Sequence, residues 1–595
     1  MKTKNKSQTM NPTRLFDLLE LFVKPLNKPD VLATKQSGEW VKYAGRDFCE
    51  LVDQISKGLL QMGVQSGDRL AIVSDGRPEW NIVDFGIQQV GAISVPIYPV
   101  MTTEDFAYIF EEAEVKIVFA ADRELSEKLS PIIATSTTVE ELFLFEQVRG
   151  TKHWKEIIKE GANANEALLA ERKLAVQPDD LLSIIYTSGT TGHPKGVMLT
   201  HQNVLSNVAE ARKYLSFGPE ARALSFLPLN HVFERMVQYT YFYQGISIYY
   251  AENVATIAEN LREVRPQVFT SVPRLLEKIY DRIVAKGYEK MRLGRTIFLW
   301  ALELGLRYDP NQSQGAWYNF QLRWARKLVF KKWKTALGGN LQLVVVGAAA
   351  LPPRIMRVFW AAQIPVCEGY GLTETSPVIA TNRLWPSLEV CIGTVGLVLE
   401  NSEVKIAEDG EILVKGPGVM KGYYRQPALT AEVLTPDGWL HTGDTGEWVA
   451  GKYLKITDRK KEIFKTSVGK YVAPQVVEAR LKESFFVEQA VVVGDGQKYA
   501  AALIVPSFEA IGEWCRIEKI PYTSDTKMIE NEQVIKKIDA EIAQSNTYLA
   551  PYERVKKYHL LAKPLTAENN ELTPTLKPKR RIIQAKYAAE IKALF

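Results

Sequence analysis

The chain has 595 residues, and single hydrophobic cores stop growing at roughly 250 to 300 residues, so its length predicts at least two domains. Its 74 Lys and Arg residues nearly balance 69 Asp and Glu residues, which gives no reason to expect a nucleic-acid partner. The four cysteines lie far apart without CxxC spacing, which indicates neither a disulfide framework nor a zinc site. No signal-peptide core and no apolar run of about 18 residues occurs, so we expect a cytoplasmic protein without a membrane span.

Short apolar runs alternate with amphipathic segments through the first two thirds of the chain. The runs are RLAIVS (69–74), GAISVPIY (91–98), VKIVFA (115–120), ELFLF (141–145), LLSIIY (181–186), ALSFLPL (223–229), QVFTSVP (267–273) and QLVVVGAAA (342–350). Apolar runs of this length, separated by amphipathic stretches, are typical of buried strands in layered α/β folds. We therefore predict a large N-terminal domain built from layered sheets and helices.

The sequence pattern changes twice toward the C-terminus. From Glu403 the sequence EVKIAEDGEILVKGPGVMKGYY alternates short strands with glycine turns, which indicates a small antiparallel unit. Beyond Asp458, APQVVEARLKES is typical of a helix and FVEQAVVVGDGQKYAAALIVP of a hairpin. These patterns predict an N-terminal domain at residues 1–457 and a small α+β domain at residues 462–595.

Residues 286–334 carry many Lys and Arg residues against only three acidic residues, with four tryptophans interleaved. The segment FQLRWARKLVFKKWK (320–334) has apolar residues at helical spacing, and basic residues beside Trp suit a lipid headgroup interface. A helix packed on the core with a solvated basic face would give the same pattern. Peripheral membrane contact and a solvated surface therefore both stay open. No RNA-binding signature occurs, so we expect no nucleic-acid partner.

The segment YTSGTTGHPKG (186–196) is compatible with a phosphate-binding loop or with a polar turn. It differs from the P-loop pattern, because Lys195 is followed by Gly196 and a strand-like VMLT rather than by Ser or Thr and a helix. Its glycines permit close backbone approach, its hydroxyls can donate hydrogen bonds and Lys195 supplies charge, as polyphosphate binding requires. Turns rich in Ser, Thr and Gly are also common without a ligand, so these residues alone decide nothing.

Six further motifs follow this loop in a recognisable order, and together they resemble the adenylate-forming enzymes, which include acyl-CoA synthetases, peptide-synthetase adenylation domains and luciferases. The loop's companions are LPLNHVFER (227–235), VVVGAAALPP (344–353), EGYGLTET (368–375), HTGD (441–444), DRKKEIFKTSVGKYVAP (458–474) and LTPTLKPKR (572–580). The resemblance covers nearly the whole chain. Within that superfamily, SVPRLLEKIYDRI (271–283) and the basic aromatic segment at 286–334 are similar to the long-chain fatty acyl-CoA synthetase branch.

This resemblance implies a ligase that activates a fatty acid with ATP, forms an acyl-adenylate and transfers the acyl group to CoA, releasing AMP and pyrophosphate. Three alternatives stay open. One is an acyl-AMP ligase that hands its acyl group to a carrier protein, and another is a CoA ligase for medium-chain or aromatic acids. The third is a non-catalytic lipid-binding protein on the same fold. The oligomeric state is also open, and a dimer is compatible with the sequence.

The resemblance also implies which residues bind ATP. The β- and γ-phosphates would be held by Thr187, Ser188, Gly189, Thr190, Thr191, Gly192 and Lys195. Mg²⁺ would be held by Glu374 with Thr187, since a hard cation takes oxygen ligands and stays partly bound to substrate phosphate. Thr373 would bond the α-phosphate. The adenosine site would comprise Gly347, Ala348, Ala349, Glu368, Gly369, Tyr370, Asp444 and Arg459, with Tyr370 against adenine and the Asp444 carboxylate accepting the ribose hydroxyls.

For the acid, the resemblance places His231 beside the carboxylate pocket, with positioning as its expected role. The acyl chain would lie against Val232, Phe233, Tyr239 and Tyr243. Pocket depth depends on tertiary packing, so the sequence leaves the preferred chain length open.

The C-terminal motifs imply a lysine and a hinge. Lys579 would bridge the carboxylate and phosphate oxygens during adenylation, with Lys577 as a rival because this chain has Pro578 where the family has glycine. Rotation about Lys461, in a hinge at residues 458–461, would then bring the CoA-binding residues to the site, namely Gly469 and Lys470.

Overall fold

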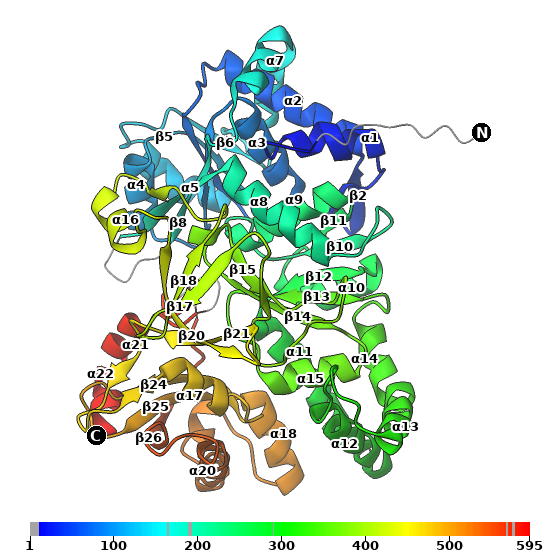
Figure 1. The fold of residues 1–595 in the computed structure, drawn as a ribbon, viewed down its shortest axis with the longest axis vertical. Helices are drawn as coiled ribbons and strands as arrows, with labels where there is room; N and C mark the ends of the chain where they lie inside the picture. The colour runs from blue at the N-terminus through cyan, green and yellow to red at the C-terminus, as the bar shows by residue number, and fades with distance from the viewer. Residues whose placement is uncertain (1–10, 164–165, 188–192, 290, 567–568, 574–576) are drawn as a thin grey trace.

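The computed structural model describes residues 11–163, 166–187, 193–289, 291–566, 569–573 and 577–595. Two large sheets with their helices form most of the N-terminal part, and a smaller α+β part holds the C-terminus (Figure 1). The predicted α/β class, with a small antiparallel unit and a C-terminal α+β domain, is confirmed. The domain boundary at residues 458–461 stays a prediction. Across these described ranges, no helix has the length and apolar character needed to cross a membrane.

The first large sheet is parallel at its centre. Its described strands are, in spatial order, β19 (Gly422–Tyr423), β9 (Lys195–Thr200), β8 (Leu181–Thr187), β4 (Ile93–Ile97), β3 (Arg69–Val73), β5 (Val115–Ala120), β6 (Glu141–Leu144) and β7 (Lys152–His153). Strands β4, β3, β5 and β6 pair in parallel, and they are mostly buried, which explains their continuous apolar sequences. Strands β8 and β9 pair antiparallel, so the ends of the YTSGTTGHPKG segment meet where Thr187 pairs with Lys195.

The second large sheet shares the core with the first. Its described strands are, in spatial order, β16 (Leu397–Val398), β15 (Val378–Thr381), β14 (Val366–Gly371), β13 (Leu343–Val346), β12 (Val268–Ser271), β10 (Arg222–Ser225), β11 (Ser247–Tyr250), β1 (Leu32–Gln36) and β2 (Glu39–Tyr43). Strands β14, β13, β12, β10 and β11 pair in parallel. Their carboxyl ends therefore share one edge of the sheet, where ligands of open α/β sheets bind.

Two wholly buried helices join the sheets. Every residue of α3 (Pro78–Gln89) is buried, and so is α9 (Val232–Gln244) from Val232 to Tyr243. From α9, the Arg235 guanidinium bonds Ser183 on β8 at 2.8 Å, and Gln238 bonds Ser225 on β10 at 2.9 Å. Helix α9 is thereby fixed between the two sheets.

A buried ion pair ties α9 to α3. The Arg235 guanidinium lies 2.6 Å from the Asp84 carboxylate, and both side chains are almost fully shielded from solvent. The Tyr239 hydroxyl donates to the same carboxylate at 2.5 Å. Removing one partner of such a pair would leave an uncompensated buried charge, so the orientation of α9 about its axis is strongly fixed.

The other helices of the N-terminal part include α2 (Gly45–Gln61), whose Phe48 ring stacks on Phe242 of α9 at 5.5 Å. The remaining ones before residue 270 are α1 (Lys24–Leu26), α4 (Thr103–Glu112), α5 (Arg123–Ile133), α6 (Lys155–Glu160), α7 (Glu166–Ala175), α8 (His201–Ala211) and α10 (Ile257–Val264). Two more follow, α15 (Pro353–Ala361) and α16 (Pro427–Val433).

The basic aromatic segment begins at the end of α11 (Pro273–Tyr288) and forms further helices, of which α12 (Arg292–Leu306) and α13 (Ala316–Ala325) lie at the periphery of the molecule (Figure 1). After them come a π-helical turn at Arg326–Phe330 and α14 (Lys331–Ala336). One face of α13 packs on α12, where the Tyr318 hydroxyl donates to the Leu304 carbonyl at 2.7 Å. This segment is therefore an ordered, packed part of the fold.

The antiparallel unit contains β17 (Glu403–Ile406), β18 (Glu411–Lys415), β20 (Leu440–Val449) and β21 (Tyr453–Arg459). After it come the short pair β22 (Phe464–Lys465) and β23 (Tyr471–Val472), and the sheet of β24 (Val487–Val493), β25 (Ala500–Pro506) and β26 (Val555–Leu560). The C-terminal helices are α17 (Pro474–Leu481), α18 (Phe508–Glu518), α19 (Asp525–Met528), α20 (Glu532–Asn546), α21 (Arg580–Lys586) and α22 (Ala588–Ala593). The predicted hairpin is present as β24 and β25, which pair antiparallel.

Candidate functional site

A cleft of about 2870 Å³ lies between the two large sheets, the antiparallel unit and the C-terminal part. Its lining comes from the adjoining ends of β8 and β9, the turn after β13, the end of β14, the strands β20 and β21, and the segment around Lys577. Pockets for drug-sized ligands are usually about 300 to 1,000 Å³. The cleft therefore has room for a nucleotide together with a second large ligand.

One end of the cleft gathers an ammonium and a carboxylate. Lys195 starts β9, and burial lowers the pKa of its ammonium while Glu374 opposes that shift. The Glu374 Oε1 atom accepts a hydrogen bond of 2.8 Å from Tyr423, whose ring lies 4.9 Å from the Lys195 ammonium. Thr187 lies in the same lining. This arrangement suits polyphosphate with a bound cation. The predicted phosphate-binding residues 188–192 lie outside the described residues.

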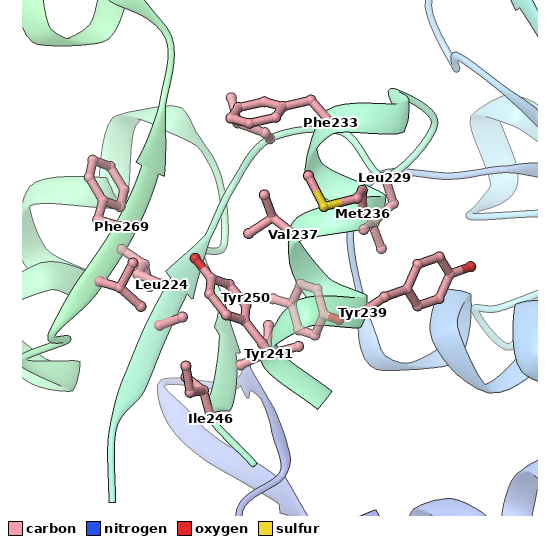
Figure 2. Close-up of a cluster of buried hydrophobic side chains, with 14 of the residues drawn as sticks. Leu224, Leu229, Phe233, Met236, Val237, Tyr239, Tyr241, Ile246, Tyr250 and Phe269 are labelled. Atoms are coloured by element: carbon pink, nitrogen blue, oxygen red, sulfur yellow. The ribbon is translucent and has the colours of Figure 1, made fainter. Parts of the chain in front are cut away.

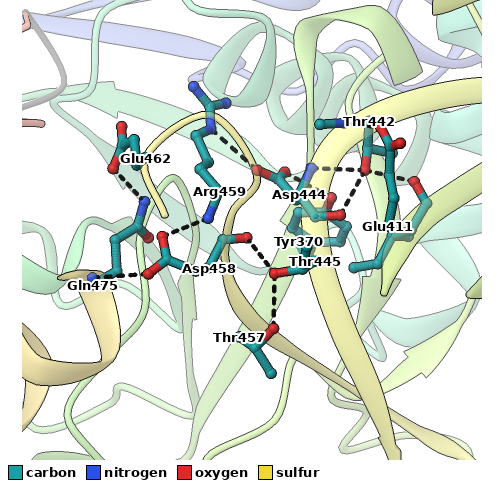
Figure 3. A network of polar contacts seen from close by, with 12 residues as sticks. Tyr370, Glu411, Thr442, Asp444, Thr445, Thr457, Asp458, Arg459, Glu462 and Gln475 are labelled. Carbon is teal, nitrogen blue, oxygen red and sulfur yellow. Dashed lines mark hydrogen bonds and ion pairs between the residues drawn. The ribbon is translucent and has the colours of Figure 1, made fainter. Parts of the chain in front are cut away.

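A buried carboxylate faces the cleft from the antiparallel unit (Figure 3). Asp444 is 5% exposed and pairs in register with Arg459, whose Nε donates to Asp444 Oδ1 at 3.1 Å. The Tyr370 hydroxyl donates to Asp444 Oδ2 at 2.8 Å. Each carboxylate oxygen keeps a further lone pair toward the cleft, as recognition of a ribose diol requires. The structure therefore brings together three residues that the sequence predicted for one adenosine site.

The turn after β13 separates the Tyr370 side of the cleft from α9. Gly347, Ala348 and Ala349 line the cleft, and Ala348 has a positive φ of 72°. A Cβ added at Gly347 would meet the Phe233 ring at 3.2 Å, so a larger residue would require that ring to shift. This small-residue turn leaves space for a planar ring beside Tyr370.

Glu368 lies behind this turn. Its carboxylate accepts a hydrogen bond of 3.1 Å from the Leu351 backbone N–H, and burial raises the pKa of its carboxyl to about 8. Glu368 and the following Gly369 are both part of the cleft wall. A neutral carboxyl can both donate and accept, which is compatible with reading the edge of a base.

His231 forms the N-cap of α9 and lines the cleft. Its Nδ1 atom accepts from the Phe233 backbone N–H at 3.2 Å, so the neutral ring carries its proton on Nε2. Burial lowers the pKa of His231 to about 4, and the nearby Lys577 ammonium adds to that shift. At neutral pH this histidine is therefore an uncharged hydrogen-bond donor rather than a proton acceptor.

Lys577 and Lys579 have different neighbours in the structure. Lys577 stands in the open cleft, where burial by the walls and the charge of Arg459 lower the pKa of its ammonium to about 8, against the opposing charges of Asp444, Glu462 and Glu374. Lys579 instead donates to the Asn570 side chain, and burial lowers the pKa of its ammonium against the opposing charge of Asp105 on α4. Both lysines line the cleft, and the role predicted for Lys579 stays a prediction; in this arrangement the charges of Asp444, Arg459 and Glu374 act on its rival Lys577.

The contacts of Arg580 explain the positions of the two lysines. Its guanidinium bonds Glu478 at 2.7 and 2.8 Å and Glu462 at 2.9 Å, where α21 begins. This anchor fixes Lys579 as the residue before the helix. The chain then turns around Pro578, and Lys577 is held by a hydrogen bond of 3.0 Å from its backbone N–H to the Thr573 hydroxyl.

One face of α9 continues the cleft beyond His231. The residues on this face are Phe233, Met236, Val237, Thr240 and Tyr241, at the spacing of a single helical face. Further lining comes from Ala211, Tyr214, Leu215, Leu343, Val345, Leu384 and Leu399. This mostly apolar branch is suited to an extended hydrocarbon chain.

Of the predicted acyl-pocket residues, Phe233 lines the cleft, whereas Val232, Tyr239 and Tyr243 lie outside its lining. Tyr239 turns away from Phe233, Met236 and Val237 (Figure 2), toward Asp84 on α3. The Tyr243 ring packs at 4.3 Å against Phe22. Because α9 is buried all round, including its polar residues Glu234, Arg235 and Gln238, burial does not distinguish the face that meets a ligand.

The predicted hinge residue Lys461 lines the cleft and contributes to lowering the pKa of Lys195, after burial. Gly469 has a φ of 82° in the exposed turn between β22 and β23, and Lys470 is exposed beside it. In this arrangement both residues lie outside the cleft lining. The structure thus brings Lys577 to the site and leaves the predicted CoA-binding turn on the surface.

At the end of the cleft that contains Lys195 and Glu374, a divalent cation would need ligands from the substrate phosphates as well as from the protein. No group of three or more His, Cys, Asp or Glu side chains able to hold a metal occurs in the described part of the chain. Glu374 has one oxygen bonded to Tyr423, and its second oxygen accepts no hydrogen bond from the described residues, so that oxygen can bind a cation. Mg²⁺ is commonly held by one or two carboxylates together with substrate phosphates. Glu374 and Thr187 are therefore a suitable donor set for Mg²⁺ bound to a nucleotide.

Comparison with family models gives two matches. The model described as AMP-binding enzyme matches residues 22–424, and the model described as AMP-binding enzyme C-terminal domain matches residues 461–595. Together they span both halves of the cleft.

Two curated relatives illustrate the similarity in sequence. The chain is 34% identical over 567 residues to the long-chain-fatty-acid–CoA ligase FadD15 of Mycobacterium bovis, covering 94% of this chain and 93% of that protein. It is 31% identical over 599 residues to human long-chain-fatty-acid–CoA ligase 1, covering 96% of this chain and 83% of that protein. Among solved structures, the adenylation domain of a carboxylic acid reductase from Segniliparus rugosus, in complex with AMP, matches with a TM-score of 0.74 and 22% identity, covering 98% of this chain and 94% of that one. At 22% identity, the match to this solved structure shows a shared fold only.

Proposed function

This chain belongs to the AMP-binding enzyme family, and we propose that it is an ATP-dependent long-chain fatty acid–CoA ligase that works through an acyl-adenylate. The observation that carries the proposal is the meeting of an ammonium and carboxylate end, a ribose-type carboxylate and an apolar branch in one cleft. Relatives that are ligases for long-chain fatty acids, and that match over nearly the whole chain, support this substrate class.

In the first half-reaction, a fatty acid carboxylate attacks the α-phosphorus of ATP, and the bond to pyrophosphate breaks. Negative charge spreads over phosphate oxygens, so the protein acts mainly by positioning and neutralisation. We assign Lys195 to the departing pyrophosphate, Thr373 to the α-phosphate and Lys577 to the oxygens between the reacting groups. His231 donates its Nε2 proton as a hydrogen bond to the acid and keeps the acid in line with the phosphorus.

Substrate recognition uses the remaining cleft residues. Asp444 accepts the ribose hydroxyls while Tyr370 and Arg459 hold its carboxylate in place. The adenine ring lies between Tyr370 and the turn at Gly347 to Ala349, beside Glu368 and Gly369. Glu374 and Thr187 hold Mg²⁺, which neutralises phosphate charge when bound. Thr187 ends strand β8, and the phosphate-binding residues proposed at 188–192 follow it directly in the sequence.

In the second half-reaction, the CoA thiolate attacks the acyl carbonyl, and AMP leaves with the electron pair of the broken acyl–phosphate bond. We propose that the C-terminal domain rotates about Lys461 between the two steps. Rotation withdraws Lys577 and brings the turn at Gly469 and Lys470 to the cleft, where glycine leaves room for the pantetheine arm.

An acid-panel assay tests this function. Purified protein with palmitate or oleate, ATP, Mg²⁺ and CoA should yield acyl-CoA, AMP and pyrophosphate in equal amounts. Acyl-CoA from only short or aromatic acids would contradict the substrate class. Formation of acyl-adenylate without acyl-CoA, in the presence of free CoA, would instead support transfer to a carrier protein.

We also propose peripheral membrane contact through residues 286–334. Long-chain acids partition into bilayers, because each buried CH₂ contributes about 0.8 kcal/mol. An enzyme held at that surface would meet its acid substrate where the acid is concentrated.

A further inference from the structure

Helix α13 presents apolar side chains on two opposite faces. Its inner face is buried through Tyr318, Leu322 and Ala325. Its outer face, continued through the following turn, exposes Trp317 by 69%, Phe320 by 50%, Trp324 by 45% and Leu328 by 45%. A surface helix normally needs only one apolar stripe, and exposed apolar patches mark interaction sites. Packing within the fold therefore does not account for the apolar side chains on the outer face.

The outer side chains form a continuous surface. The Trp317 and Phe320 rings stack at 5.6 Å, and Phe320 meets Trp324 edge to face at 6.5 Å. The Lys327 ammonium lies 5.4 Å from the Trp324 ring. We call Trp317, Phe320, Trp324 and Leu328 the aromatic stripe. These residues are ordered against one another, so the stripe is preorganised for a flat partner.

The charge around the stripe has one sign. No Asp or Glu occurs from residue 310 to residue 367, whereas Arg323, Lys327, Lys331 and Lys332 are exposed beside or just after the stripe. Within the described residues, these four side chains form no ion pair. Arg326 differs, because its guanidinium donates to the Ala361 carbonyl at 2.9 Å and serves the fold. The free cations therefore offer an attractive surface to an anionic partner.

We propose that the aromatic stripe and its cations dock the protein onto an anionic lipid bilayer, with the rings at headgroup depth and the lysines on lipid phosphates. Aromatic and aliphatic side chains beside Lys and Arg are the composition of interfacial helices. A second copy of the chain is disfavoured as the occupant, because a two-fold contact would bring like charges together. Helices α12 and α13 lie at the periphery of the molecule (Figure 1), and the side chains of the stripe are exposed to solvent. This inference specifies the lipid class and the residues of the proposed membrane contact, and only its benefit to the reaction rests on the proposed function.

Vesicle flotation tests the docking without ATP, CoA or acid, so that its outcome is independent of catalysis. The full chain should float with vesicles of equal parts phosphatidylcholine and phosphatidylglycerol, and should stay in solution with phosphatidylcholine alone. The triple variant Trp317→Ser, Phe320→Ser, Trp324→Ser should lower the partition coefficient at least about tenfold. The variant Lys327→Gln, Lys331→Gln, Lys332→Gln should lose a similar factor at low salt and show a weaker salt dependence.

A matched control changes three exposed lysines of the C-terminal part, in the variant Lys536→Gln, Lys556→Gln, Lys557→Gln. This control should float like the wild type, and all variants should keep the wild-type rate on a water-soluble acid in the absence of vesicles, which also verifies folding. Undiminished flotation of both stripe variants would overturn the proposal. So would a wild-type dimer, measured by sedimentation, that the aromatic variant converts to a monomer while vesicle binding is unchanged.

Discussion

The Tyr423 hydroxyl donates a hydrogen bond of 2.8 Å to the Oε1 atom of Glu374. The same tyrosine pairs with Val197 of β9, two residues beyond Lys195, and its ring lies 4.9 Å from the Lys195 ammonium. One side chain therefore orients both the carboxylate and the cation that we assign to the phosphates and Mg²⁺. No signature motif contains Tyr423, so it could not be selected from the sequence.

We expect Tyr423→Phe to raise the Mg²⁺ concentration needed for half-maximal adenylation about tenfold, since loss of a partner to a metal-binding carboxylate usually costs about 10 to 100-fold. The ring stays beside Lys195, so the KM for the fatty acid should change little. A Mg²⁺ titration of pyrophosphate release measures the effect. Tyr423→Leu, which also removes the ring, should in addition raise the KM for ATP. An unchanged Mg²⁺ response in the Phe variant would show that the hydrogen bond has no part in cation binding.

Substitution of Lys577 and of Lys579 should have different effects. Lys577→Ala should lower the adenylation rate by at least about 100-fold, because it removes a charge aimed at the reacting oxygens. It should spare thioester formation from supplied acyl-adenylate. Lys579→Ala, with a side chain bonded to Asn570, should keep adenylation within a few-fold of wild type.

Single-turnover assays of each half-reaction distinguish these outcomes. Loss of adenylation in the Lys579 variant, with normal activity in the Lys577 variant, would return the role to Lys579. Loss of both half-reactions in the Lys577 variant would point to a folding defect, which a thermal denaturation curve checks.

The sequence predicted the parts of the site that lie within one motif or pair across one hairpin. Thr187 with Lys195, and Asp444 with Arg459, belong to antiparallel strand pairs whose register follows from local sequence. It left open the positions that depend on contacts between residues far apart in the chain. Lys577 occupies the cleft because Arg580 is anchored on Glu478, 102 residues earlier.

Contacts between residues far apart in the chain also determine which residues of α9 line the cleft. Tyr239 is turned into the core by Asp84, 155 residues away. Helix α9 is buried on every side and carries polar residues in the interior, so the sequence predicts the helix but does not show which of its side chains meet a ligand. The α/β class was predictable throughout, since continuous apolar runs are required wherever strands are buried on both faces.

The pH dependence of adenylation should reveal Lys577. Burial and then the charge of Arg459 lower the pKa of its ammonium to about 8, so the charged form that we assign to catalysis is lost as pH rises through that value. The kcat/KM for ATP, which reports groups of the free enzyme, should fall above about pH 8. His231, with a pKa of about 4, is neutral on both sides of pH 6 and should add no acidic limb between pH 5 and 7.

Lys577→Arg provides the control, because a guanidinium stays charged across this range. Its alkaline limb should disappear even if its maximal rate is lower. An alkaline limb that persists at the same pH in the Arg variant would assign the titration to another group.

The face of α9 that lines the cleft predicts how chain length is set. Val237 lies four residues beyond Phe233, about 6 Å further along the helix axis, and Tyr241 lies about 6 Å beyond that. A large side chain at 237 would block the branch partway. We expect Val237→Trp to lower kcat/KM for palmitate at least about tenfold while leaving hexanoate nearly unchanged, because only the longer chain reaches the obstruction.

Tyr243→Phe is the matched control, because its ring packs against Phe22 outside the cleft lining, and its chain-length profile should equal that of the wild type. Val237→Ala should keep activity on palmitate, because it widens the branch without blocking it. An equal loss for both acids in the Val237→Trp variant would indicate a general distortion of α9. Unchanged activity on palmitate would mean that the acyl chain does not run along this face, and the apolar branch would then have to serve another ligand.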